Sequence, residues 1–174
     1  IAVARGDDVV HVLPRRPHVG RPQDNALFDG IFAIQSERLS LEIAAGNLVT
    51  GPAGVAVSTE SVLQKGHNLN EAARQLGIRH WLFVTAFPDE ISQHSDCMIR
   101  FLGPKHCAIA TRPDLPDQDP KPLADALRDV LPELNVLQIP CHAIDSVFAS
   151  PLNWVQIGHV LLVPVFATES LENL

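Results

Sequence analysis

The feature of the sequence that most constrains its fold is a repeat with a period of about 50 residues. Hairpin turns at Gly54, Lys105 and His159 are each flanked by two apolar segments of strand length. After each of the first two turns, a segment with helical spacing of apolar residues and a further apolar segment follow in the same order. The repeating unit is therefore β-β-α-β, with two complete copies and the start of a third.

The first copy carries local signals for each of its elements. Asn68 can cap a helix, and Glu71, three residues later, can complete a capping box. Gly77 is expected to end that helix in the left-handed conformation. The strands of this copy are expected at 39–50, 55–59 and 78–84, with a turn at 51–54.

The second and third copies follow the same pattern. Pro122 lies near the first turn of the second helix, where its missing N–H costs no hydrogen bond. The buried face of this helix is expected at Leu123, Ala126, Leu127, Val130 and Leu131. Strands are expected at 96–102, 106–111, 135–139, 152–157 and 160–166. Before the repeat we expect a strand at 9–13, a loop at 14–30, and a strand or helix end at 31–35.

Short strands that alternate with helices indicate an α/β fold. With 174 residues, the chain has the size of a single domain, residues 1–174, or of part of one. Its 46% hydrophobic and 19% charged residues are typical of a globular protein. A ring of β-β-α-β units would be a propeller-like or barrel-like arrangement, and we expect this chain to hold an incomplete one.

Composition also limits the expected partners and location. The net charge of −7 argues against nucleic acid, because phosphate binding needs clustered Lys and Arg. No apolar run reaches the roughly 18 residues of a membrane span, so no membrane partner is expected. Three cysteines do not form a disulfide framework, which favours a reducing, cytoplasmic location. We expect no metal site, because Cys-x-x-Cys and His-x-x-x-His spacings are missing from the sequence.

Candidate chemistry centres on His94 and Asp96, at the start of the expected strand 96–102. Side chains two residues apart in an extended chain point to the same face. A paired His and carboxylate can act as a general base with its orienting acceptor, or can bind a cationic group. The alternative interpretation is a solvated loop residue and a strand cap.

Three segments, 45–63, 92–110 and 150–167, resemble successive blocks of the agmatine deiminase and bacterial-type peptidylarginine deiminase family. The family pattern has a Glu-Gly-Gly-Asn-like hairpin ending in Thr-Glu, then a Gly-His-x-Asp strand, then a block that begins with Asn. The resemblance implies a pentein fold, an α/β propeller of five β-β-α-β units around a central channel. It also implies hydrolysis of a guanidino group to a ureido group with release of ammonia, without a cofactor.

The resemblance implies roles for four residues. His94 would protonate the leaving amine and activate the hydrolytic water, and Asp96 would hold the substrate guanidinium through paired hydrogen bonds. Asn153 matches the Asn of the later block, with a purely structural role as the alternative. The family's acid falls at Ala44 in this sequence. Glu42 could therefore substitute for that acid in binding substrate, or could be an exposed strand carboxylate.

Two departures from the family pattern concern catalysis. Gln93 replaces the Gly that precedes the His, which can change the local turn. The nucleophilic Cys has no counterpart in this sequence, and its position is expected beyond Leu174. Cys97 adjoins Asp96 but is expected to point to the opposite face. Because deimination needs a thiolate, this chain alone is expected to be inactive.

Three hypotheses therefore stay open. The chain is a guanidino-group hydrolase, or a non-catalytic pentein homologue that binds a cationic guanidino or amine ligand or a protein partner, or an unrelated α/β repeat domain. The expected ligand is a cationic guanidino small molecule or peptidyl-arginine. An incomplete ring would expose strand edges and apolar surface, so we also expect a homo-oligomer.

Overall fold

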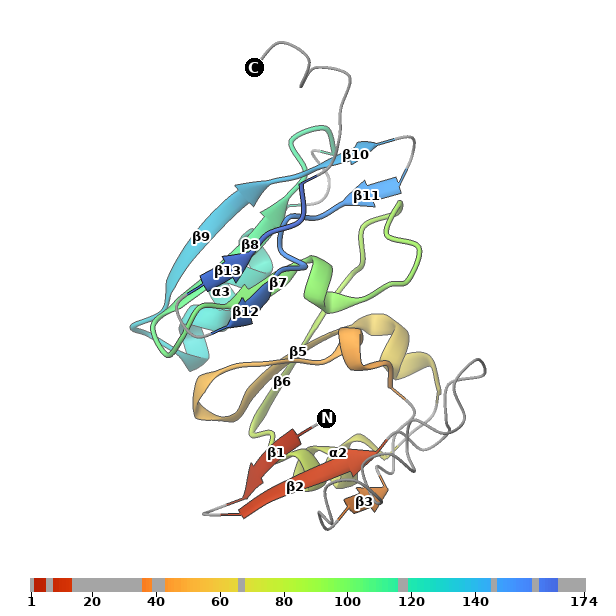
Figure 1. The fold of residues 1–174 in the computed structure, drawn as a ribbon, viewed down its shortest axis with the longest axis vertical. Coiled ribbons are helices and arrows are strands. Elements are labelled where there is room, and N and C mark those ends of the chain that lie inside the picture. Colours follow the sequence, from red (N-terminus) through yellow and green to blue (C-terminus); the bar gives the residue numbers. More distant parts are fainter. Residues whose placement is uncertain are drawn as a thin grey trace.

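Small sheets of two or three strands, with helices beside them, make up the fold (Figure 1). The computed structural model describes residues 2–5, 8–13, 36–38, 43–65, 68–115, 119–144, 147–157 and 160–165. Antiparallel and parallel strand pairs occur together with helices, which confirms the expected α/β class. The expected loop at 14–30 and the element at 31–35 fall outside the described residues.

The first unit contains the predicted β-β-α-β order. β4 (Val49–Thr50) pairs antiparallel with β5 (Val55–Thr59), and the turn η2 (Pro52–Gly54) joins them. Helix α2 (Leu69–Leu76) then leads to β6 (His80–Val84), which pairs parallel with β5. β5 is therefore the middle strand of the sheet, and all five of its residues are buried.

The second unit repeats this arrangement. β7 (Ile99–Phe101) pairs antiparallel with β8 (His106–Thr111), and β9 (Asn135–Pro140) follows helix α3 (Lys121–Val130) and pairs parallel with β8. The two units share one apolar core, which includes Val49, Val55, Val57, Ile99, Cys107, Ile109 and Leu127. Packing across the units therefore fixes β4 and β5 relative to β7 and β8.

Helix α2 shows how local signals set an element's ends. The Asn68 side chain accepts a hydrogen bond from Glu71 N (3.2 Å), as an N-cap does. Gly77 ends the helix with φ of 67°, the left-handed conformation that glycine favours. Only one of the two hydrogen bonds of the expected capping box is present. The Glu71 carboxylate pairs with Arg74 (2.6 Å) and not with the backbone N of Asn68. The turn η3 (Glu60–Lys65) precedes this helix.

Smaller elements flank the two units. β1 (Ala2–Arg5), β2 (Asp8–Leu13) and β3 (Ser36–Arg38) form one sheet, in which β2 contains the predicted strand 9–13. The hairpin of β12 (Val155–Ile157) and β13 (Val160–Leu162) lies where the third copy is predicted. A further hairpin, which the sequence analysis missed, consists of β10 (His142–Ile144) and β11 (Val147–Ala149).

Several predicted strands are wrong over part of their length: residues 78–79, 152–154 and 163–165 lie outside the strands, and two further differences affect the candidate site. Residues 45–47, predicted as strand, form the 3-10 turn η1 (Ala45–Asn47). Asp96 and Cys97, also predicted as strand, belong to the 3-10 turn η4 (Ser95–Cys97), and each turn lies just before the first strand of its unit. Asn47 Oδ1 accepts a hydrogen bond from Thr59 N (2.8 Å), and Ser95 Oγ donates to the Val57 carbonyl (3.0 Å). Such side chain to backbone bonds compete with strand pairing. β4 and β7 therefore begin only after these turns.

Candidate functional site

The candidate site lies where the turns η1 and η4 contact each other. A Cβ atom at Gly46 of η1 would overlap His94 Nδ1 and would lie 2.9 Å from Asp96 Oδ2. Both polar side chains therefore flank the same backbone position, where a residue without a Cβ is needed. The structure brings His94 and Asp96 together, as expected, but for a different reason. His94 is extended and Asp96 lies inside η4, so the predicted alternation along one strand is wrong.

Asn47 fixes η1 to the rest of its hairpin. Its buried amide donates to Thr59 Oγ1 (2.9 Å) and Ser61 Oγ (3.0 Å), while its carbonyl oxygen accepts from Thr59 N. Thr59 Oγ1 in turn donates to the Gln93 carbonyl (2.7 Å). A continuous set of hydrogen bonds therefore links the end of β5 to the residue before His94.

Glu90 fixes the same loop from its other side. Its carboxylate is buried and accepts hydrogen bonds from Ser92 Oγ (2.6 Å) and His94 N (2.7 Å). Between these residues, Gln93 has φ of 54°, in the region that glycine favours. The turn thus has the backbone conformation suited to the Gly of the family pattern, although Gln stands there. Sequence reasoning gave no role to Glu90.

Cys97 contacts the Asp96 carboxylate, with 3.6 Å between Sγ and Oδ1. The prediction that Cys97 points away from Asp96 is therefore wrong, because the two residues share the turn η4 and not an extended strand. Burial and the nearby carboxylates of Asp96 and Glu90 raise the pKa of Cys97 to about 12. At neutral pH this side chain is a thiol, which is a poor nucleophile.

Asn153 is exposed, and its backbone N donates to the Ser150 carbonyl (3.5 Å). Ser150 Oγ donates to the Cys97 carbonyl (2.5 Å), so the turn that holds Asn153 is attached to η4. Within the described part of the chain, no hydrogen bond joins the Asn153 side chain to His94 or Asp96. The other predicted substrate-binding residue, Glu42, lies outside the described residues.

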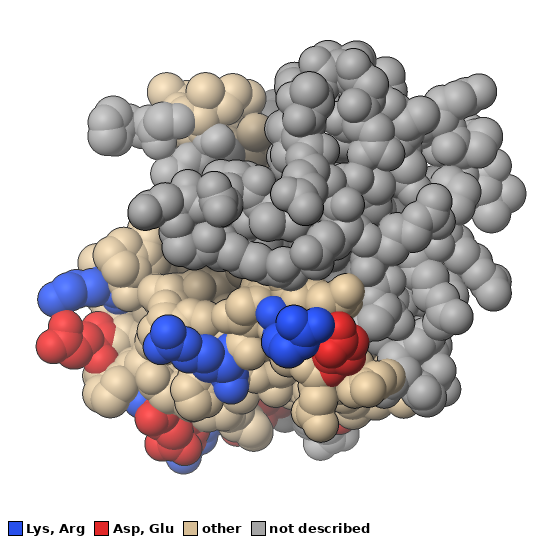
Figure 2. All heavy atoms as spheres, turned by 90° about the horizontal axis from the view of Figure 1, so that it is seen from below, with Lys and Arg blue, Asp and Glu red and all other residues tan. Residues whose placement is uncertain are grey.

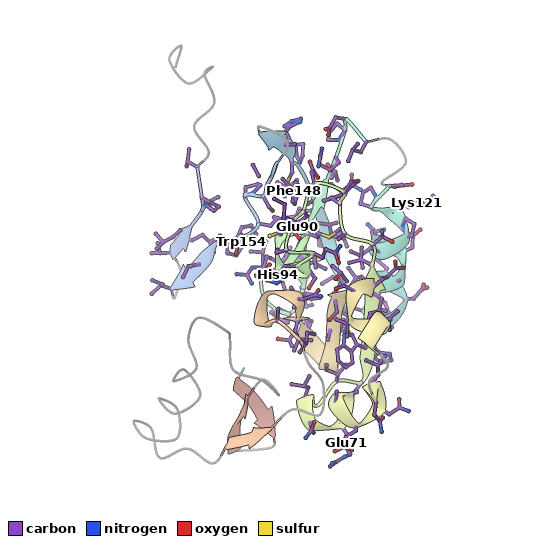
Figure 3. All side chains as sticks on the ribbon, turned by 90° about the vertical axis from the view of Figure 1, so that its right-hand side faces the viewer. Glu71, Glu90, His94, Lys121, Phe148 and Trp154 are labelled. Carbon is purple, nitrogen blue, oxygen red and sulfur yellow. The ribbon has the colours of Figure 1, made fainter. Side chains whose placement is uncertain are left out.

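The arrangement can accept a positively charged group. Asp96 and His94 are both half-buried, and Figure 3 shows His94 with Glu90 in the middle of the molecule, away from Glu71 on α2. Among the described residues, Asp96 has no ion pair with Lys or Arg. A partly desolvated carboxylate without a cationic partner favours a cation that brings its own N–H donors.

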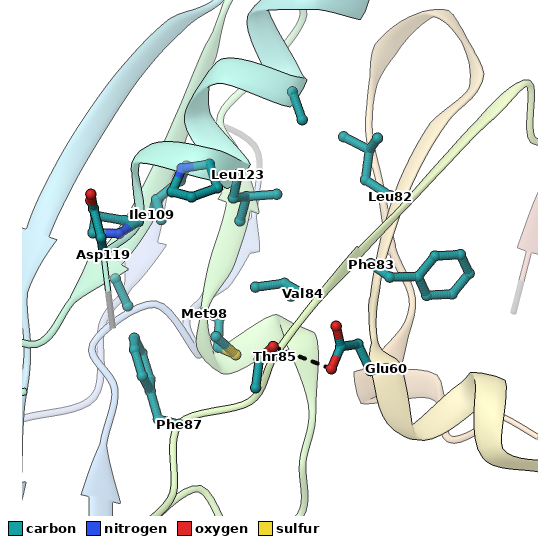
Figure 4. Close-up of a pocket in the computed structure, with 14 residues that line it drawn as sticks. Glu60, Leu82, Phe83, Val84, Thr85, Phe87, Met98, Ile109, Asp119 and Leu123 are labelled. Atoms are coloured by element: carbon teal, nitrogen blue, oxygen red, sulfur yellow. Dashed lines mark hydrogen bonds between the residues drawn. The ribbon is translucent and has the colours of Figure 1, made fainter. Parts of the chain in front are cut away.

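A cavity of about 400 Å³ lies elsewhere, between β6 and α3 (Figure 4). Apolar side chains in its walls include Leu82, Val84, Met98, Ile109 and Leu123. Two carboxylates, Glu60 and Asp119, also line it, and Thr85 Oγ1 donates to Glu60 (3.2 Å). Neither His94 nor Asp96 lines this cavity, so it is separate from the predicted site.

On the face seen in Figure 2, the described residues form no patch of only positive or only negative side chains. There, Lys and Arg side chains lie among Asp and Glu side chains over the described residues. Within the described ranges, no group of three or more His, Cys, Asp and Glu side chains could hold a metal ion. No helix in the described part of the chain is long and apolar enough to cross a membrane.

Neither a family model nor a curated protein matches the sequence. Solved structures match it in fold. The agmatine deiminase of C. jejuni matches with a TM-score of 0.68 and 16% identity, over 95% of this chain and 55% of that one. For the agmatine deiminase of Enterococcus faecalis the TM-score is 0.67 and the identity 17%, over 93% and 58%.

A third match extends the comparison to a different enzyme. The dimethylarginine dimethylaminohydrolase of Pseudomonas aeruginosa, solved in complex with citrulline, has a TM-score of 0.52 and 11% identity, over 98% of this chain and 61% of that one. The chain has part of the pentein fold. The predicted resemblance to deiminases is thus confirmed for the fold. At these identities the match concerns the fold alone, and this chain spans 55–61% of the length of the proteins it matches.

Proposed function

We propose that this chain binds a cationic guanidino group through Asp96 and His94. The observation that carries the proposal is the pair of half-buried side chains at Gly46, in which Asp96 lacks a cationic partner among the described residues. A guanidinium suits this carboxylate because its planar set of N–H donors can bind both oxygens at once. The names of the neighbouring structures support the ligand class, since agmatine carries a guanidino group and citrulline a ureido group.

We propose binding, and not hydrolysis, as the activity of this chain by itself. Deimination through a covalent intermediate needs a thiolate that attacks the guanidinium carbon. Burial raises the pKa of Cys107 and Cys141 to about 11, and that of Cys97 is about 12. All three side chains are therefore protonated at neutral pH. Where another chain segment supplied a reactive thiol, His94 would be placed to give a proton to the leaving amine.

Calorimetric titration of the purified chain with agmatine tests the proposal. Putrescine, in which an amine replaces the guanidino group of agmatine, serves as the reference ligand and is expected to bind more weakly. Asp96→Asn is expected to weaken agmatine binding at least tenfold, because a charge-assisted hydrogen bond is lost. Asp125→Asn removes an exposed carboxylate from α3 and is expected to leave the Kd unchanged. An arginine-containing peptide in place of agmatine distinguishes a peptide-bound from a small ligand.

Gly46→Ala provides a second test of the same site. The added Cβ would occupy the space against His94 and Asp96, so both side chains must move and agmatine binding is expected to be lost. If no guanidino ligand binds the unaltered chain, or if Asp125→Asn weakens binding as much as Asp96→Asn, the proposal is wrong. If the unaltered chain releases ammonia from agmatine and His94→Ala does not, the activity of the chain is hydrolysis and not binding alone.

A further inference from the structure

Arg112, directly after β8, is the most enclosed charged side chain near the site, with 3% of its side chain exposed. Its Nη1 donates to both carboxylate oxygens of Asp89 (2.5 and 2.6 Å). Nε and Nη2 donate to the two oxygens of Asp114 (2.9 and 2.6 Å). The rings of Phe87 and Phe148 lie 5.7 and 5.5 Å from the guanidinium carbon. Two carboxylates and two aromatic rings therefore hold this guanidinium in one orientation.

An enclosure of this kind fixes geometry more effectively than it adds stability. Buried ion pairs pay a large desolvation cost, and apolar residues of similar volume often stabilise a protein equally well. A bidentate Arg–carboxylate pair, however, fixes the position and direction of its carboxylate. Arg112 holds Asp114 through two nitrogens and the less exposed Asp89 through both of its carboxylate oxygens, and the Asp89 carbonyl also accepts from Phe148 N (3.1 Å). Asp89 is thus held both by its side chain and by its backbone.

Asp89 is next to Glu90, and Glu90 holds His94. The Glu90 side chain is buried, at 8% exposure, and its Oε2 accepts from His94 N at 2.7 Å. Its Oε1 accepts from Ser92 Oγ, which closes the loop around the carboxylate. The buried guanidinium and the backbone of His94 are therefore connected through two adjacent residues. Figure 3 shows Phe148, Glu90 and His94 in the same region of the molecule.

We propose that Arg112 is a positioning residue for His94. By clamping Asp89, it holds the Glu90 carboxylate against the His94 N–H, and so sets how the imidazole meets Gly46 and Asp96. The effect of Arg112 on His94 follows from contacts within the folded chain, whereas an effect of Arg112 on ligand affinity rests on the proposed function.

Nuclear magnetic resonance of the ¹⁵N-labelled chain tests this without any ligand. A bond to a carboxylate shifts an amide proton downfield and slows its exchange with solvent. In Arg112→Lys, the single ammonium cannot bind two carboxylates in the same bidentate way. We expect the His94 amide proton to move upfield and to exchange about tenfold faster, and we expect the same change in Glu90→Gln. Arg128→Lys changes an exposed Arg–Asp pair on α3 and is expected to change neither signal.

The outcomes separate positioning from plain stabilisation. If Arg112 were only structural, Arg112→Lys would lower the midpoint of unfolding and leave the His94 signals of the folded chain unchanged, which would overturn the proposal. Should Arg112→Lys not fold, Asp89→Asn breaks the same link while Arg112 keeps its pair with Asp114.

Agmatine titrations of the same variants then link the clamp to ligand affinity. We expect the Kd to rise several-fold in Arg112→Lys and in Asp89→Asn. If agmatine does not bind the unaltered chain but the His94 signals respond as expected, the proposed function fails and the positioning role stands. If agmatine binds and neither the His94 signals nor the Kd respond to these variants, the positioning role fails alone.

Discussion

Gln93 occupies a backbone conformation that costs free energy for any residue with a side chain. Its φ of 54° brings the Cβ atom close to the backbone, a cost of about 1–2 kcal/mol that glycine does not have. The Gln93 side chain is exposed, so its removal loses no packing. Glycine also gives the unfolded chain more freedom, which offsets part of the gain. Gln93→Gly is therefore expected to raise the free energy of unfolding by about 0.5–1 kcal/mol, measured by urea denaturation.

A matched substitution shows whether the conformation is responsible. Gln138 is also exposed but lies inside β9, where the backbone is extended. Gln138→Gly is expected to lower the free energy of unfolding by about 0.5–1 kcal/mol, because glycine is unfavourable inside a strand. Equal losses in both variants would mean that Gln93 is not strained.

Cys97 is expected to react slowly with alkylating reagents in the folded chain. A pKa of about 12 leaves very little thiolate at pH 8, and the fraction grows with pH until the pKa is reached. The rate of iodoacetamide modification of Cys97, followed by peptide mass spectrometry, should therefore rise up to at least pH 11. For an ordinary thiol, with a pKa of 9.0, the rate would instead level off soon above pH 9.

Asp96→Asn provides the internal comparison for Cys97. It removes a negative charge that disfavours the thiolate, so the pKa falls and the rate at pH 8 rises. Asp125→Asn, on α3, should leave the rate unchanged. A Cys97 rate that levels off near pH 9 in the unaltered chain would contradict the burial of this thiol and its contact with Asp96.

At the level of elements, the sequence predicted the ends of a helix or strand only where the residues that bond there are close in sequence. α2 follows from Asn68 and Gly77, which act within the helix itself, and the sequence therefore sufficed to predict both ends. η1 and η4 do not follow from local pattern, because their apolar neighbours suggest a strand. Asn47 of η1 bonds to Thr59, 12 residues away in its own unit, and Ser95 of η4 bonds to Val57 of the other unit, so these partners are known only once the chain has folded.

Arg112 also links elements, and it makes stability depend on acid pH through Asp114. Hydrogen bonds from Arg112 lower the pKa of Asp114 from 3.8 to about 2. A carboxylate whose pKa is depressed by folding stabilises the folded state above its unfolded pKa and loses this effect as pH falls through the folded value. The contribution should therefore be complete above about pH 4 and should disappear towards pH 2.

Urea denaturation between pH 2 and 6 measures this contribution. We expect the free energy of unfolding of Asp114→Asn to fall less steeply below pH 4 than that of the unaltered chain. Asp125→Asn, which changes an exposed carboxylate paired with Arg128, serves as the control. Identical acid profiles for all three proteins would show that the pair with Arg112 has no linkage to pH.

For the whole molecule, the repeat was the most informative signal in the sequence. Hairpin turns at regular spacing predicted two β-β-α-β units, because each unit folds from residues that are close in sequence. The same signal predicted the β12–β13 hairpin. The Arg112 enclosure could not be predicted, because its partners lie 23 and 36 residues away, Asp89 in a turn and Phe148 in the unpredicted strand β11.

The β12–β13 hairpin should promote association between copies of the chain. Its pairing places Val155 opposite Leu162 and Ile157 opposite Val160, and these four side chains are 55–63% exposed. In the two complete units, the corresponding second strands β5 and β8 are mostly buried, and each packs with residues of a helix and pairs with a parallel strand. Apolar side chains left exposed on a two-stranded hairpin favour pairing with another molecule.

Analytical ultracentrifugation over a range of concentrations tests this expectation. We propose that the unaltered chain forms homo-oligomers, and that the double variant Ile157→Lys, Leu162→Lys weakens association at least tenfold, because each apolar side chain contributes about 1.5–3 kcal/mol when buried. Ile91→Lys makes the same kind of change at an exposed side chain in the loop before His94 and should leave association unchanged. A chain that is monomeric at every concentration, or that Ile91→Lys dissociates as fully as the double variant, would show that the hairpin is not the interface.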